Sequence, residues 1–178
     1  MRLIKLCAWT LLLAACEPSK QQTQQLFDSK QFFAQQIWLL NNQKTALQKH
    51  VWYNNLCDSL VISKGINWEK ELRLFSEFDF AKPTNSKLFK VDTTYTENEI
   101  NVTYRAIDNA QRIKHALIQL NKNYQIKAVA FSTSQKTNLF GSAQQLRYVV
   151  DSGFSINTEQ QTQLAEDALY KIEGKFIQ

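Results

Sequence analysis

The chain has 178 residues, and its 21 lysines and arginines against 16 acidic residues give a formal net charge of +5. The charges are interspersed, which excludes the basic stripe or patch that nucleic-acid binding requires, so we expect no nucleic-acid partner. The length is sufficient for one domain with its own hydrophobic core.

The first sixteen residues have the features of a bacterial lipoprotein signal. Arg2 and Lys5 form a short positive region, and an apolar run of about ten residues follows, too short to span a bilayer as a helix. The run ends with Leu13-Ala14-Ala15-Cys16, the pattern of a lipobox, in which the cysteine becomes the acylated N-terminus. An ordinary secretory signal, with Cys16 left as a free thiol, is the alternative.

This interpretation divides the chain into three parts. Residues 1–15 are the signal peptide, residues 16–25 are the lipidated Cys16 and a polar tether, and residues 26–178 are a single domain. Removing residues 1–15 leaves 163 residues with 19 basic against 16 acidic side chains, a net charge of +3. Two or three acyl chains on Cys16 would hold the domain firmly to a membrane.

Only one cysteine remains for the domain, because Cys7 leaves with the signal and Cys16 carries lipid. Cys57 therefore has no intramolecular partner, and the domain must be stabilised by its hydrophobic core. Its strand-like surroundings predict that Cys57 acts as a small buried hydrophobe rather than as a reactive thiol.

The N-terminal half predicts two helices around a β-hairpin. Asp28 is the expected N-cap of the first helix, with Phe27 and Phe32 in the positions of a hydrophobic staple. Its apolar face is expected to contain the residues Phe33, Ile37 and Leu40, broadened by Trp38 and Leu39. Residues 47–52 and 56–62 favour two strands around Asn54-Asn55.

A second helix is expected to begin after Asn67, which can cap it, and to end before Pro83. Trp68, Leu72 and Phe75 share one face of this helix. From residue 88 onward, alternating apolar and polar residues predict a long β-meander. We therefore predict an α+β fold: an antiparallel, curved sheet of six or more strands with two helices packed on it.

Several of these segments resemble a known family. They are the run Ile66–Phe75 with Lys82-Pro83 after it, Lys90-Val91-Asp92, Val102-Thr103-Tyr104 and the ending Tyr170–Phe176. In these the chain resembles a family of uncharacterised envelope lipoproteins of Bacteroidota. The resemblance implies a fold and the lipidated cysteine, Cys16, but no activity.

The sequence offers few candidates for catalysis or metal binding. His50 and His115 are the only histidines, and neither shares ligand spacing with Cys57 on one element. The glycines are scattered, and the acidic pairs Glu69/Glu71, Glu97/Glu99 and Glu166/Asp167 are interpreted as exposed charge. We therefore expect no enzyme, no catalytic residues, no metal site and no cofactor.

Several strands carry apolar residues on both faces, which leaves two functions open. Leu117 precedes Ile118, Ala128 and Ala130 alternate with Val129 and Phe131, and Val149 precedes Val150. Such strands indicate either closure of a curved core or a groove for an apolar ligand or partner. We favour closure and a binding or scaffolding module; a carrier of lipid or another apolar ligand is the alternative.

The residues after Cys16 bear on location. Surface-displayed lipoproteins of the resembled family tend to carry an acidic cluster there, whereas here Glu17 stands alone before Pro18, Ser19 and Lys20. We therefore expect a domain on the periplasmic face of the outer membrane, held by acyl chains on Cys16.

Overall fold

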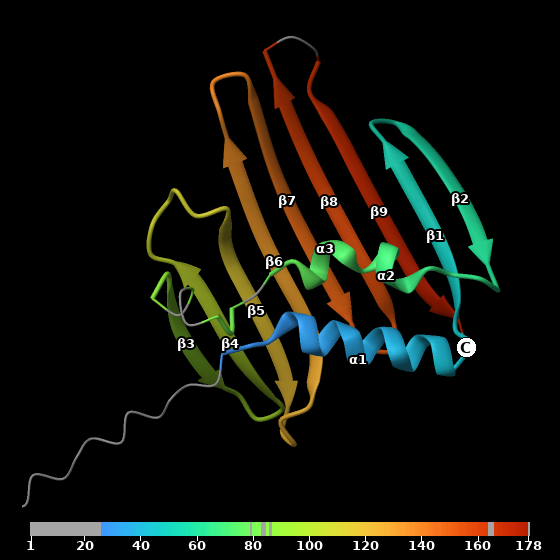
Figure 1. The fold of residues 1–178 in the computed structure, drawn as a ribbon, viewed down its shortest axis with the longest axis horizontal. Coiled ribbons are helices and arrows are strands. Elements are labelled where there is room, and N and C mark those ends of the chain that lie inside the picture. Colours follow the sequence, from blue (N-terminus) through green and yellow to red (C-terminus); the bar gives the residue numbers. More distant parts are fainter. Residues whose placement is uncertain (1–25, 79, 83–84, 86, 164–165, 178) are drawn as a thin grey trace, which may run out of the picture.

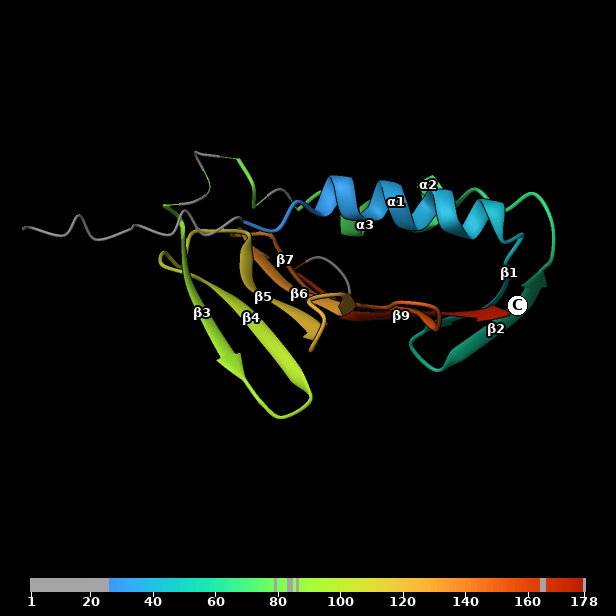
Figure 2. The ribbon, with the colours of Figure 1, turned by 90° about the horizontal axis from the view of Figure 1, so that it is seen from below.

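A computed structural model describes residues 26–78, 80–82, 85, 87–163 and 166–177. Within them, short helices lie across one face of a large antiparallel sheet (Figures 1 and 2). This confirms an α+β fold with more than six strands, although the content is mostly β. Cys16 and the predicted signal and tether lie outside the described residues.

The elements follow one another in the predicted order. The N-terminal part contains α1 (Ser29–Asn42), β1 (Ala46–Tyr53), β2 (Leu56–Ile62), α2 (Trp68–Glu71) and α3 (Arg73–Ser76). The meander contains β3 (Phe89–Tyr95), β4 (Glu99–Ala106), β5 (Ile113–Asn121), β6 (Ile126–Lys136), β7 (Phe140–Val149), β8 (Gly153–Thr162) and β9 (Ala168–Ile177).

Within the described residues, all nine strands form one sheet in the order β2-β1-β9-β8-β7-β6-β5-β4-β3. Consecutive strands from β3 to β9 are neighbours, as short links require. The β1–β2 hairpin extends the sheet beyond β9, with Ala46 opposite Ile177 and Tyr53 opposite Tyr170. The two ends of the domain therefore meet in one strand pair, while β2 and β3 form the edges (Figure 1).

Helix α1 begins where the sequence predicts it. The Asp28 carboxylate accepts a hydrogen bond from the backbone N–H of Gln31 at 2.9 Å, and the Phe27 and Phe32 rings lie 5.6 Å apart. The predicted broadening of the apolar face is wrong, because Trp38 is 64% exposed and Leu39 is 37% exposed. A helix lying flat on a sheet buries only one stripe, and that stripe here includes Phe33 and Leu40.

The second predicted helix is present but interrupted. The Asn67 side chain accepts a hydrogen bond from the Lys70 N–H at 2.8 Å and so caps α2. Leu72 has φ −101° and ψ 6°, outside the helical region, and separates α2 from α3. Even so, Trp68, Leu72 and Phe75 are all buried, as predicted. Pro83 lies outside the described residues.

The core lies between the helices and the sheet. Alternate residues of the central strands point toward the helices, and they are buried: Ala116, Ile118, Val129, Phe131, Leu146, Tyr148, Phe154, Ile156 and Phe176. Aromatic rings fill this layer, with centroid distances of 5.2 Å from Phe33 to Tyr148 and 5.5 Å from Trp68 to Phe176. Such a layer is close-packed, so its members are sensitive to truncation.

Gly174 makes room for one of these rings. It lies opposite Phe154 in the β8–β9 pair, and a Cβ on Gly174 would stand 2.4 Å from the Phe154 ring. The glycine in the predicted last strand therefore leaves the space beside β9 that the Phe154 ring occupies. Among the described residues, α1 is the longest helix, and none meets the length and apolarity needed to cross a membrane.

We expect Trp68→Ala to lower the free energy of unfolding by about 3–5 kcal/mol, because the indole is 2% exposed and the cavity would not refill. Trp38→Ala is the matched control: Trp38 is 64% exposed, and its loss should change stability by about 0.5 kcal/mol or less. Urea unfolding measures both. Equal stability of the two variants would contradict the assignment of Trp68 to the core.

Candidate functional site

The sheet face opposite the helices, called here the open face, has no described element covering it (Figure 2). Strand alternation places the second set of side chains on this face. One transverse row runs Leu117, Ala130, Arg147, Ser155, Glu173 and His50 across β5, β6, β7, β8, β9 and β1. In the last strand Lys171, Glu173 and Lys175 lie on this face.

Small residues on both sides of Arg147 hollow out the centre of the open face. Its cross-strand neighbours are Ala130 on β6 and Ser155 on β8. Neither fills the space beside the guanidinium stem, and Arg147 lines three adjoining hollows. The hollow toward β1 measures about 350 Å³ and is also lined by His50, Glu173 and Lys175.

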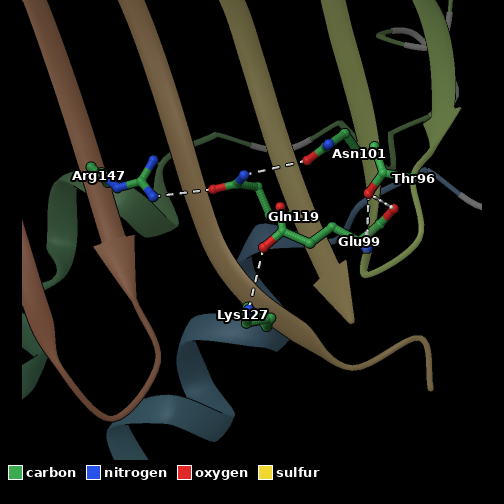
Figure 3. Close-up of polar contacts among 6 residues, drawn as sticks. All are labelled: Thr96, Glu99, Asn101, Gln119, Lys127 and Arg147. Atoms are coloured by element: carbon green, nitrogen blue, oxygen red, sulfur yellow. Dashed lines mark hydrogen bonds and ion pairs between the residues drawn. The ribbon is translucent and has the colours of Figure 1, made fainter. Parts of the chain in front are cut away.

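A chain of side-chain hydrogen bonds orients Arg147 (Figure 3). Its Nη2 donates to Oε1 of Gln119 at 3.1 Å, and Nε2 of Gln119 donates to Oδ1 of Asn101 at 3.3 Å. Both ends of the Gln119 amide are thereby occupied. The guanidinium is held over the hollow by neutral amide groups rather than by a carboxylate.

A β-bulge brings a further charge to the same end of the face. Gln119 is paired with Ala128 and Leu120 with Ile126, so Lys127 is an extra residue in β6. Its Nζ lies 3.3 Å from Oε1 of Glu99. Strict alternation would have put Lys127 on the helix side, so sequence reasoning missed this ion pair.

A second group of side chains gathers at the β1 end. The His50 ring stacks on Trp52, with centroids 5.6 Å apart and planes 22° apart. Nζ of Lys171 lies 4.7 Å from the centre of the Trp52 ring and 2.7 Å from Oε1 of Glu173. Lys171 is thus neutralised, whereas Lys175 and Arg147 have no acidic partner within 4 Å among the described residues.

His115 also lies on the open face, opposite Ser132 of β6. It is half-buried and pairs with Arg105 on β4, whose Nη1 lies 2.8 Å from Oδ2 of Asp92. Burial lowers the pKa of His115 below its usual 6.5, and the positive charge of Arg105 lowers it further. His115 is therefore neutral at neutral pH.

The sequence-derived candidates do not converge on a catalytic or metal site. His50 and His115 lie on well-separated strands, and in the described part of the chain no three potential ligands form a metal-binding group. The prediction that Cys57 is buried is wrong: it is exposed on edge strand β2. Edge exposure could not be derived from a strand-like pattern alone.

The acidic pairs are partly as predicted. Glu71 is the exception, because its Oε2 lies 2.7 Å from Nζ of Lys49 and both side chains are largely covered. Glu99 is engaged by Lys127, while Glu166 and Asp167 are exposed in the link before β9. The ion pair between Glu71 and Lys49 attaches α2 to β1, the second strand from the edge of the sheet.

The two-sided apolar strands have a simple explanation. Ala128, Ala130, Leu117 and Val149 all lie on the open face, where they form the floor between longer polar side chains. The signal that could have located the hollow is the run of small residues at every second position of β6.

Comparison with protein families, with curated proteins and with solved structures gives no match for this chain.

We expect the pKa of His115 to lie below 6.5 and to rise in Arg105→Gln without reaching that value, because burial, the larger cause, remains. The depressed pKa stabilises the fold above about pH 6.5, and this contribution is lost as the pH falls through the folded-state pKa. NMR titration measures the pKa of His115, with Arg73→Gln, at an exposed position of α3, as the control. A pKa at or above 6.5 would contradict the assigned environment.

Proposed function

We propose that this chain is a lipid-anchored, non-enzymatic binding or scaffolding module of the bacterial envelope, and that it binds through the open face. The observation that carries the proposal is the asymmetry of the sheet. One face is covered by helices and filled with aromatic rings, while the opposite face is uncovered and hollowed around Arg147. Concave surfaces with a few oriented polar groups are the usual form of binding sites.

The charges of the open face favour an acidic partner. Arg105, Lys127 and Lys171 each form an ion pair with a carboxylate. Among the described residues, no carboxylate forms an ion pair with Arg147 or Lys175. Both uncompensated cations line the same hollow. A partner that presents carboxylates there would gain charge-assisted hydrogen bonds from a guanidinium that is already oriented.

A carrier of apolar ligands is the weaker alternative. Such a carrier needs an enclosed apolar space. The layer between the sheet and the helices is instead filled by aromatic rings in contact; the ring centroids of Phe78 and Phe131, for example, lie 4.5 Å apart. The hollows of the open face have an apolar floor, but they are open to solvent and carry charged and amide side chains around it. The binding module is therefore the function that the geometry supports best.

We expect a photoreactive amino acid at position 155, inside the hollows, to form covalent adducts with a partner in cells. The same amino acid at position 38, on the exposed side of α1, should form few. Arg147→Glu should reduce the adducts from position 155 at least several-fold, because it reverses the central charge. Arg73→Glu, on the helix side, should not. Equal adducts from both positions would contradict binding through the open face.

The anchor is tested at Cys16. We expect Cys16→Ser to abolish acyl labelling and to release the protein from membranes or leave its precursor unprocessed, because the thioether to the lipid cannot form. Gel mobility, labelling with a radioactive fatty acid and membrane fractionation measure this, with Cys57→Ser as the control. An unchanged mass and membrane fraction in Cys16→Ser would contradict lipidation.

Protease treatment of the same cells tests on which side of the outer membrane the domain lies. A periplasmic face predicts that protease added to intact cells leaves the protein whole, whereas permeabilised cells lose it. Digestion in intact cells would place the domain on the outer surface.

A further inference from the structure

The edge strand β2 is unusually open for pairing. All its residues from Leu56 to Val61 are exposed, with Leu56 at 72% and Val61 at 63%, and no described element lies beyond it (Figure 1). It contains no proline, lysine or bulge, features that normally prevent edge pairing, and Asp58 is its single charged residue. The opposite edge, β3, carries Lys90 and Asp92.

The backbone of β2 is self-complementary. The Asn54 N–H donates to the Leu169 carbonyl on β9, so odd-numbered residues of β1 face β2. Alternation along the antiparallel pair then assigns Leu56, Asp58, Leu60 and Ile62 to hydrogen bonds with β1. The outward N–H and C=O groups of β2 therefore belong to Cys57, Ser59 and Val61.

We propose that two copies of this chain pair through β2, antiparallel and centred on Ser59. In this register Ser59 lies opposite Ser59 of the second copy and Cys57 lies opposite its Val61. Shifting the register leaves at least one outward residue facing the turn or the end of the strand. Only pairing about Ser59 matches all three outward residues of both copies, which gives six backbone hydrogen bonds.

The side chains agree with this register. On the open-face side, two serine hydroxyls meet at the centre, and the apolar Cys57 and Val61 pair on either side of them. On the helix side, the exposed Leu60 of each copy lies directly opposite Asp58 of the other and diagonal to its Leu60, so both leucines lose exposed apolar surface. A second copy thus covers the apolar residues that make this edge unfavourable when it is left in water.

The two-fold axis of such a pair is perpendicular to the sheet. Both helix layers then lie on one side and both open faces on the other, forming one continuous surface with two Arg147 hollows. This inference goes beyond the proposed function and does not depend on lipidation or on the nature of the partner.

We expect Cys57→Ser/Ser59→Cys, in the full-length chain, to form a disulfide-linked dimer when cells or membranes are treated with a mild oxidant. Facing residues of a hydrogen-bonded pair have Cα atoms about 5.5 Å apart, within disulfide range. The native Cys57 should not cross-link although it is exposed, because its counterpart lies four residues along the strand, about 13 Å away.

Non-reducing gels measure the cross-link. Cys57→Ser alone and Cys57→Ser/Thr93→Cys, in the middle of edge β3, are the controls and should remain monomeric. Adding Val61→Pro to the Ser59→Cys variant should reduce cross-linking several-fold, since it removes one outward N–H from each copy and none that bonds to β1. Val61→Thr keeps the N–H and should cross-link normally.

Three results would contradict the proposed pairing of β2. A disulfide dimer through native Cys57 would replace the proposed register with another. Absence of cross-linking at position 59 in a variant with a normal melting temperature would overturn the pairing. A covalent product whose mass is not twice that of the chain would show that β2 receives a strand from a different protein. Unchanged membrane fractionation in each variant separates these outcomes from failure of the anchor.

Discussion

The side chain of Tyr148, on the middle strand β7, determines how the helices lie on this sheet. Its ring is fully buried and has Phe32, Phe33, Phe75 and Phe176 as aromatic neighbours. A buried phenol needs a hydrogen-bond partner, and Tyr148 donates to Oε1 of Gln36 on α1 at 2.9 Å. Burial raises the pKa of Tyr148 well above its usual 10, so it remains a donor.

This one contact has consequences on both faces. It directs Gln36 inward, and the helical period then places Phe33 and Leu40 against the sheet and Trp38 in water. With every helix on the Tyr148 side, the alternate residues of the same strands are left to solvent. Arg147 is exposed because Tyr148 is buried.

Much of the fold could be predicted because its signals are local. The caps at Asp28 and Asn67, the turn at Asn54-Asn55 and the meander after residue 88 depend on neighbours within a few positions. The wrong predictions concern residues whose burial or exposure depends on distant parts of the chain. Cys57 has the pattern of a buried strand, but no strand of the described residues lies beyond β2, and that follows from the whole strand order.

The candidate site was harder to predict for the same reason. Gln119 and Arg147 are 28 positions apart, and only strand register makes them neighbours. The bulge at Lys127 inverts the side on which a residue lies, and no feature of the local sequence distinguishes it from a regular strand. The small residues Ala128 and Ala130 were visible as apolar, but their role as the floor of a hollow depends on which face the helices occupy.

The pairing of β1 with β9 has a consequence for the order in which this chain can fold. Residues 46–53 leave the ribosome more than a hundred residues before residues 170–177, their partners. Until then the β1–β2 hairpin is a two-stranded ribbon, which is marginal in water, and Leu47 and Trp68 have no Phe176 to pack against. Closing so long a loop is entropically costly and makes folding slow. Strand β9 thus completes the pairing of β1, and a nascent domain with two unsatisfied strands must be kept from aggregating until β9 is synthesised.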